Sequence, residues 1–309
     1  MSKIATREAY GKALVKLGKI NDDVVVLDAD LSKSTKTNDF LKAYPNRFFN
    51  MGIAEQNLVG AACGFAAAGK IPFASTFAMF ATGRAFEVIR NSVCYPKANV
   101  KIAATHAGIT VGPDGGSHQA IEDIALMCSL PNMVVLSPAD DIEACKCVKA
   151  AAEIDAPVYL RFGRIALDDI YTDEYDFQIG KGNEIFSGND VTIISTGIMV
   201  HKSLKAAKEL KEEGINARVI NMATIKPIDQ EIIIKAAKET KGIVTVEEHS
   251  VIGGLGDRVS AVVCENAPIV VKKIGVKDVF GESGSPDVLL EKHGLTVENI
   301  KETVKNIVR

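Results

Sequence analysis

The stretch NMGIAEQNLVGAACGFAAAGKIPFASTF, residues 50–77, places a helical pattern directly before a short apolar run. Residues 55–68 are almost all Gly, Ala and other small apolar residues, and a helix that is apolar on every side is expected to be buried. Residues 71–75 have the length and composition of a buried strand. The stretch therefore predicts one helix–strand unit of an α/β protein.

The same alternation extends along the chain in both directions. Other strand-like runs lie at residues 23–27, 100–105, 133–136 and 158–162, with helical patterns at residues 6–18, 85–94, 120–129 and 142–153. Residues 168–189 are acidic and weakly periodic, as a linker would be, and the alternation then resumes. Strands that alternate with helices indicate a parallel sheet with helices on its faces.

We therefore predict two α/β domains, each a mainly parallel sheet with helices on both faces. The first domain is expected over residues 1–172, a linker over residues 173–189 and the second domain over residues 190–309.

Composition excludes several classes of protein. The 309 residues are 47% hydrophobic and 24% charged, with a net charge of −3, so no basic surplus favours nucleic-acid binding. No run approaches the 18 apolar residues of a membrane span, and the N-terminus lacks the apolar core of a signal peptide. The six cysteines form no CxxC pair, which favours free thiols in a reducing compartment over a metal site. We expect a cytoplasmic protein that binds no metal through its own residues.

Polar and aromatic residues follow several of the predicted strands of the first domain. Ligands of open α/β sheets bind beyond the carboxyl ends of the strands, so these residues are candidates for a site. In chain order they are Ser34, Phe77, Phe80, His106, Asp114, His118 and Arg164. Taken singly, each of these residues could instead have an ordinary structural role. The aromatic rings and His106 could belong to the core, Ser34 and Arg164 could be surface residues, and residues 112–118 could be a plain turn with Ser117 as a helix cap.

Glu55 is the only charged residue of a helical stretch, residues 55–68, that is otherwise mostly small and apolar. Burial would raise the pKa of its carboxyl group, and a protonated acid near neutral pH could give a proton to a ring nitrogen. A glutamate bonded to free amides at a helix start is an equally good interpretation from the residues alone. The run Gly253–Asp257 lacks the spacing of a phosphate loop, which favours a packed helix start there.

Seven motifs together resemble the C-terminal portion of transketolase, from about Lys3 to the end. They are IATREAYGKALVKLG, MGIAEQN, STFAMF, ATHAGITVGPDGGSHQAIED, LRFGR, INMATIKPID and VTVEEHSVIGGLGD. The resemblance implies a pyrimidine-binding domain followed by the transketolase C-terminal domain, with thiamine diphosphate as cofactor.

The resemblance also implies a role for each candidate residue. Glu55 would be the catalytic glutamate that bonds the aminopyrimidine ring, with Phe80 stacked on that ring and Phe77 beside it. His106 and His118 would lie near the sugar hydroxyls and carbonyl, with His118 also catalytic, and Asp114 would bind a sugar hydroxyl. The groups that grip the sugar phosphate would be Arg7, Ser34 and Arg164.

Two departures from the family pattern bear on function. Gly83 stands where some members place an aromatic residue, which would thin one wall of the cofactor pocket. The chain also contains neither the GDG motif nor the Asn pair that bind the diphosphate and Mg²⁺ in full-length members. A separate N-terminal subunit is therefore expected to supply that site, in a heterotetramer built as a dimer of heterodimers.

The resemblance implies the C-terminal subunit of a split transketolase, which would move a two-carbon ketol group between phosphorylated sugars. Three alternatives stay open. They are the β subunit of the first component of a 2-oxoacid dehydrogenase, an enzyme like 1-deoxyxylulose-5-phosphate synthase, and a non-catalytic structural subunit that kept the fold.

Overall fold

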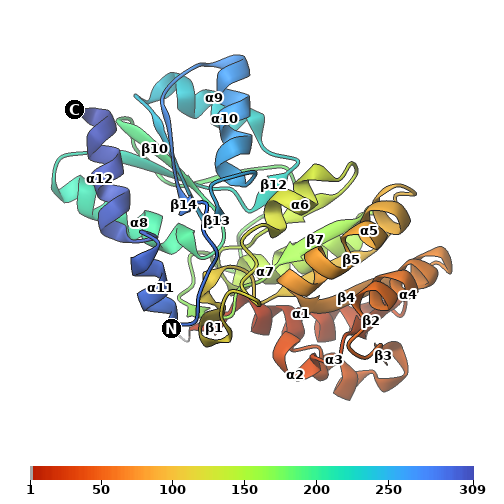
Figure 1. Ribbon diagram of the computed structural model, residues 1–309. Coiled ribbons are helices and arrows are strands. Elements are labelled where there is room, and N and C mark those ends of the chain that lie inside the picture. Colours follow the sequence, from red (N-terminus) through yellow and green to blue (C-terminus); the bar gives the residue numbers. More distant parts are fainter. Residues whose placement is uncertain (1–2) are drawn as a thin grey trace.

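A computed structural model describes residues 3–309 and shows two large β-sheets with helices around them (Figure 1). The N-terminal sheet has seven strands, and all neighbouring pairs run parallel except at one edge, where β12 is antiparallel to β6. In spatial order the strands are β12 (Thr224–Lys226), β6 (Val134–Leu136), β7 (Val158–Arg161), β5 (Lys101–Thr105), β4 (Ile71–Phe77), β2 (Val24–Asp28) and β3 (Phe48–Asn50).

Helices cover both faces of this sheet. One face carries α1 (Thr6–Ile20), α3 (Asn38–Ala43) and α7 (Asp141–Glu153). The other carries α4 (Glu55–Ala67), α6 (Asp123–Ser129), and two π-helical turns, Phe80–Arg84 and Ile89–Cys94, that flank α5 (Phe86–Val88). Successive residues of β2 alternate between the two cores, which is why this strand is a continuous apolar run.

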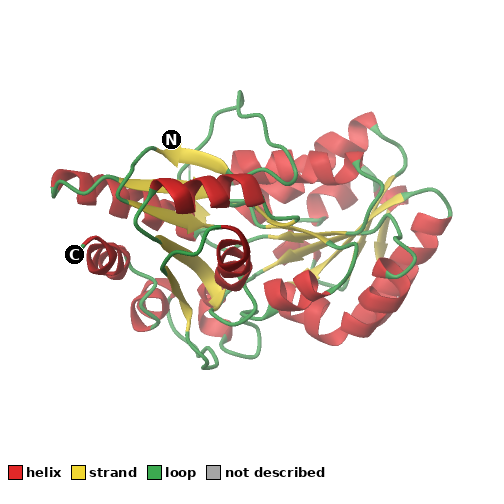
Figure 2. Ribbon diagram, turned by 90° about the horizontal axis from the view of Figure 1, so that it is seen from above, coloured by secondary structure: helices red, strands yellow, loops and turns green. Residues whose placement is uncertain are grey.

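The C-terminal sheet has five strands and the same layered arrangement (Figure 2). Its order is β14 (Val271–Val276), β13 (Ile243–Ser250), β10 (Val191–Ser195), β11 (Ala217–Asn221) and β9 (Asn183–Phe186), with only β9 antiparallel. One face packs against α8 (Met199–Glu212), α11 (Pro286–Lys292) and α12 (Val297–Val308), and the other against α9 (Gln230–Glu239) and α10 (Leu255–Asn266). The predicted fold class is confirmed.

Two short strands depart from the expected division of the chain. β12 comes from the C-terminal half but pairs with β6 at the edge of the N-terminal sheet. β9 lies inside residues 173–189, the expected linker, and pairs with β11. A further small sheet joins β1 (Ile4–Ala5) to β8 (Ala166–Leu167). The domain boundaries given above stay a prediction.

Helix α4 is less buried than its composition suggested. Glu55, Leu58, Val59 and Ala62 are buried, but Gly60 and Gly64 are exposed. A Cβ atom built on either glycine would meet no atom of residues 3–309 within 4 Å. The expectation of a helix enclosed on every side is therefore wrong for this chain by itself. From Gly60 to Ala67, the exposed positions of α4 carry only glycine and alanine, so this part of the helix lies open without bulky side chains.

Two further expectations concern the chain as a whole. Within residues 3–309, no helix has the length and apolar character needed to cross a membrane. The six cysteines are free thiols, and three of them are buried.

Candidate active site

The candidate residues meet at one edge of the N-terminal sheet, where the parallel strands end. Ser34 lies in α2 (Ser32–Thr35) after β2, Glu55 begins α4 after β3, and Phe77 ends β4. His106 follows β5, and Arg164 comes three residues after the end of β7. Because neighbouring strands run parallel, their carboxyl ends bring these five residues to the same side of the sheet.

Four aromatic rings form a cluster at this edge. The Phe77 ring stacks on His106 with ring centres 3.9 Å apart, and it lies 5.6 Å from Phe80. His118 meets Phe80 edge-on at 5.1 Å. The four residues come from the end of β4, the turn after it and the long segment after β5, so the sequence-predicted aromatic and imidazole residues are brought together.

Glu55 lies buried beside this cluster, with 4% of its surface exposed. Its Oε1 accepts a hydrogen bond from Arg84 Nη1 at 3.0 Å, which makes a charged pair. In the described part of the chain, the carboxylate bonds this guanidinium and no backbone amide. The interpretation of Glu55 as a simple cap of its own helix is therefore not supported.

Arg84 is the site residue that the sequence analysis missed. Its guanidinium carbon lies 4.0 Å above the centre of the Phe80 ring, and its side chain is half exposed. A planar cation thus contacts both the Glu55 carboxylate and the Phe80 ring. Phe80 and Arg84 are four positions apart in a helical segment, and side chains at that spacing share a face, which is the signal that would have found Arg84. A cavity of about 400 Å³ opens between Arg84 and the start of α4.

His106 is a neutral hydrogen-bond acceptor in this arrangement. Burial and the nearby charges of Arg7 and Arg164 lower its pKa to about 3. Its Nδ1 lies 2.9 Å from Thr105 Oγ1, and its Nε2 lies 3.4 Å from Arg7 Nη1. Since Arg7 can only donate, Nε2 is the acceptor and Nδ1 carries the proton. The backbone of His106 has a φ of +58°, and its ring stacks on that of Phe77.

A buried carboxylate holds the segment that carries Ser34. Asp28 accepts hydrogen bonds from the Leu31 amide at 2.6 Å and from the hydroxyls of Thr35 and Thr37 at 2.7 and 2.9 Å. Burial raises the pKa of Asp28. The backbone carbonyl of Ser34 accepts from Arg7 Nη1 at 2.9 Å, so this loop positions Arg7.

Two guanidinium groups face the same edge. Arg7 is partly buried, and its Nε is buried without a partner among the described residues. Burial lowers the pKa of Arg7, and the nearby charge of Arg164 lowers it further. Arg164 lies 3.6 Å from Asp114 Oδ2 and donates to the Val111 carbonyl. Two neighbouring guanidinium groups suit a phosphate or carboxylate group.

Asp114 and His118 lie on a glycine-rich segment after β5, at the end of a 3₁₀ turn (Ile109–Asp114). Ser117 Oγ lies 3.0 Å from His118 Nδ1, and α6 begins only at Asp123, so the alternative role of Ser117 as a helix cap is wrong. Within residues 3–309, no group of three or more His, Cys, Asp or Glu side chains is placed to hold a metal ion.

Comparison with family models identifies both halves of the chain. Residues 2–169 match the model described as transketolase, pyrimidine binding domain, and residues 180–300 match transketolase, C-terminal domain. The chain belongs to the transketolase family.

Individual relatives differ in length. A transketolase C-terminal section of Methanocaldococcus jannaschii is 52% identical over 301 residues, which cover 96% of this chain and 94% of the relative. A 6-deoxy-6-sulfo-D-fructose transketolase subunit of a Clostridium species is 40% identical, over 95% of this chain and 91% of the relative. The transketolase of Rattus norvegicus is 40% identical over 99% of this chain, but this chain spans only 49% of its length.

The solved structure of a split gene transketolase, an inactive beta4 tetramer, superposes with a TM-score of 0.91 at 57% identity, and 99% of each chain is covered.

Proposed function

We propose that this chain is the C-terminal subunit of a split transketolase, a transferase that moves a two-carbon ketol group between phosphorylated sugars with thiamine diphosphate. The observation that carries the proposal is the arrangement of Glu55, the aromatic cluster and the two guanidinium groups along one sheet edge. A buried acid beside aromatic rings suits a heterocyclic cofactor, and the guanidinium groups suit a phosphorylated substrate.

The residues at this edge fit the aminopyrimidine end of the cofactor. Glu55 and Phe80 already hold a planar cationic group, the Arg84 guanidinium. Glu55 accepts a hydrogen bond from it and Phe80 stacks against it, and an aminopyrimidine ring would require the same two contacts. Glu55 would hold or give a proton at a ring nitrogen, and Phe80 and Phe77 would wall the ring. When bound, thiamine diphosphate would supply the electron sink for breaking a carbon–carbon bond next to a carbonyl.

Arg84 has to leave for this to occur. Its guanidinium pairs with Glu55 at 3.0 Å and covers the Phe80 ring at 4.0 Å, so it takes up the contacts assigned to the cofactor ring. Since half of the Arg84 side chain is exposed, it can move outward into solvent. Loading of the cofactor is therefore expected to be a competition with Arg84.

The sugar would bind on the other side of the aromatic cluster. His106 presents a neutral ring, which suits a hydroxyl or carbonyl group. Asp114 is exposed, and its carboxylate, which pairs with Arg164 at 3.6 Å, would accept a hydrogen bond from a sugar hydroxyl. Arg7, through its unpartnered Nε, and Arg164 would bind the phosphate, with Ser34 beside them. His118 would hold or move a proton at the sugar carbonyl.

A second chain completes the enzyme in this proposal. This chain spans 49% of the length of the rat transketolase that it matches, and the face of α4 that carries Gly60 and Gly64 is open. A separate N-terminal subunit would cover that face and supply the diphosphate and Mg²⁺ site, in a dimer of heterodimers. The free thiols favour a cytoplasmic location.

Reconstitution with the N-terminal subunit tests the proposal. With thiamine diphosphate and Mg²⁺, the two chains should convert xylulose 5-phosphate and ribose 5-phosphate, and neither chain should do so alone. Pyruvate, with and without glyceraldehyde 3-phosphate, tests the two alternative enzymes in the same assay. Glu55→Ala should abolish turnover and leave the melting temperature nearly unchanged. A reconstituted Glu55→Ala variant with normal turnover would show that the assigned role of Glu55 is wrong.

A further inference from the structure

The segment that carries Asp114 and His118 lies against the C-terminal domain. We call residues 109–118 the sugar loop. Gly108 precedes it with a φ of +80°, and Gly112 and Gly115 lie within it at +84° and +78°. Glycine can adopt many backbone conformations, so a glycine-rich loop of this kind needs contacts with other segments to hold it in a single conformation.

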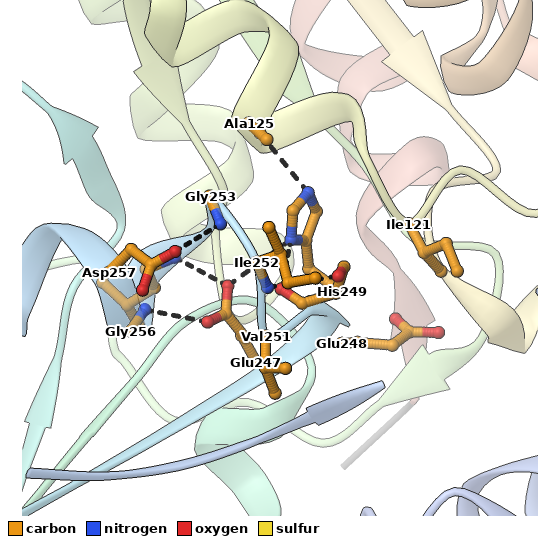
Figure 3. A network of polar contacts seen from close by, with 12 residues as sticks. Ile121, Ala125, Glu247, Glu248, His249, Val251, Ile252, Gly253, Gly256 and Asp257 are labelled. Atoms are coloured by element: carbon orange, nitrogen blue, oxygen red, sulfur yellow. Dashed lines mark hydrogen bonds and ion pairs between the residues drawn. The ribbon is translucent and has the colours of Figure 1, made fainter. Parts of the chain in front are cut away.

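Glu248 of β13 supplies the first contact. Its side chain is buried, and its Oε1 accepts a hydrogen bond from the Thr110 amide at 2.6 Å. A Cβ atom on Gly108 would lie 2.2 Å from the Glu248 carboxyl carbon, so only glycine lets the loop approach this closely. Figure 3 shows the carboxyl groups of Glu247 and Glu248 on different sides of β13. Glu247 instead accepts from the Leu255 and Gly256 amides at the start of α10, which confirms the packed helix start expected there.

The strand that bears Glu248 is itself tied to the N-terminal domain. Arg161 Nη2 donates to the Glu248 carbonyl at 2.9 Å, and Arg161 Nε pairs with Asp123 Oδ2 at 2.7 Å. Burial alone would raise the pKa of Asp123, but the charge of Arg161 and the hydrogen bonds from Arg161 and Tyr159 act against burial, and the net effect is a lowered pKa. Glu248 therefore contacts the loop from a fixed position.

A second contact comes from residues 281–283, between β14 and α11. Gln119 Nε2 donates to the Ile109 and Gly112 carbonyls at 3.1 and 3.3 Å and to the Glu282 carbonyl at 2.9 Å. One buried amide thus ties both parts of the 3₁₀ turn to the C-terminal domain. A Cβ atom on Gly281 would lie 1.8 Å from Gln119 Oε1, so this contact also depends on a glycine.

We propose that the C-terminal domain positions the sugar loop, with Glu248 as the positioning residue that sets how well Asp114 and His118 meet the substrate. The inference rests on the proposed function and deepens it. It gives the second domain, which carries none of the predicted site residues, a part in substrate recognition. Glu248 acts through the Thr110 amide and does not touch the substrate.

The first measurement follows the loop directly, with no need for activity. Hydrogen–deuterium exchange at residues 109–118 should rise roughly tenfold in Glu248→Ala, because the Thr110 amide and its neighbours lose their anchor. Glu248→Gln keeps an acceptor oxygen and should exchange almost like the unaltered chain. Gly281→Ala disturbs the second contact from a partly exposed segment, so it should raise the same exchange and still fold.

The matched control is Glu143→Ala. Glu143 is also a buried carboxylate that joins the two domains, through Asn221 at 2.8 Å, but it makes no hydrogen bond to the sugar loop. Exchange at residues 109–118 should stay at the unaltered level in this variant. A rise there equal to that of Glu248→Ala would mean that any loss at the domain boundary loosens the loop, which would overturn the proposal.

The second measurement uses the reconstituted enzyme. Glu248→Ala should raise the KM for the sugar phosphates roughly 10- to 100-fold, because a displacement near 1 Å in a binding group costs about that much. The affinity for thiamine diphosphate should stay within about twofold, since Glu55 and Phe80 are untouched. Glu248→Gln should restore the KM to within about threefold.

The outcomes separate the two proposals. If the unaltered pair of chains fails to act on sugar phosphates but Glu248→Ala still loosens residues 109–118, the proposed function fails and the anchoring role of Glu248 stands. If Glu248→Ala leaves either the exchange or the sugar KM unchanged in an active enzyme, positioning by Glu248 is refuted. A fall in cofactor affinity that equals the rise in sugar KM would also refute it, because that result indicates general damage.

Discussion

Replacing Arg84 by alanine should strengthen the binding of thiamine diphosphate. The guanidinium of Arg84 contacts the two groups that the proposed cofactor ring requires, the Glu55 carboxylate at 3.0 Å and the Phe80 ring at 4.0 Å. Arg84→Ala removes the competitor and leaves both groups in place. The variant should therefore bind the cofactor more tightly than the unaltered chain.

The size of the effect follows from the two contacts that are lost. An ion pair with one exposed partner contributes about 0.2–1 kcal/mol. A guanidinium over an aromatic ring at an exposed site contributes about 0.5–1 kcal/mol. The sum is about 0.7–2 kcal/mol, and since 1.4 kcal/mol is a factor of ten, the dissociation constant should fall about 3- to 30-fold.

Calorimetric titration of thiamine diphosphate into the two-chain complex with Mg²⁺ would measure this change. Arg84→Lys keeps the charge but loses the planar stacking, so it should fall between the alanine variant and the unaltered protein. Arg90→Ala is the matched control, because Arg90 is exposed and its side chain bonds the neighbouring Asn91 at 2.7 Å. If Arg84→Ala binds thiamine diphosphate no more tightly than the unaltered protein, the competition is refuted. Weaker binding would indicate that Arg84 helps to hold the cofactor.

Three further predictions address the phosphate group, the buried ion pair and pH. Arg164→Met should raise the KM for phosphorylated sugars at least tenfold and that for unphosphorylated sugars little, and steady-state kinetics with equal changes would contradict the assignment. Arg161→Met should cost about 3–5 kcal/mol in urea unfolding, because Asp123 is left buried and unpaired, and a loss below about 1 kcal/mol would show that water reaches Asp123. Burial raises the pKa of Glu248 from near 4.5 to about 7, so the native chain binds this proton more tightly than the unfolded chain. Stability from this group is full below pH 4.5 and declines up to pH 7, and Glu248→Gln should flatten unfolding free energies between pH 5 and 7.

The sheet edge could be predicted because it depends on local patterns. Alternating apolar runs gave the strands, and parallel strands bring their carboxyl ends together whatever the details of packing. Phe77 and His106, which are far apart in the sequence, could therefore be placed near each other without any knowledge of contacts, and their rings are 3.9 Å apart.

Contacts across long sequence separations could not be predicted. Glu248 and Thr110 are 138 residues apart, and nothing in either segment marks the other as its partner. β12 has three residues, too few to show a period, and it pairs with a sheet of the other half. The spacing of Phe80 and Arg84 could have placed the two side chains on one face of a π-helical segment, but the pairing of Arg84 with Glu55, 29 residues earlier, could not be read from that spacing.

The exposed face of α4 shows a different limit of prediction from sequence. An apolar pattern predicts that a surface is buried, but it does not show which chain buries it. A Cβ atom on Gly60 or Gly64 would meet no described residue within 4 Å, and Glu55 at the start of the same helix is paired with Arg84, which would have to move for the proposed cofactor to bind. A buried carboxylate is less stable without a partner, so Glu55 needs a temporary partner as long as the proposed cofactor and second subunit are not bound. Arg84 meets that need because it is close enough to pair and exposed enough to leave. Under the proposed function, the open helix face and the Arg84–Glu55 pair have one common cause, a site that would be completed by another polypeptide.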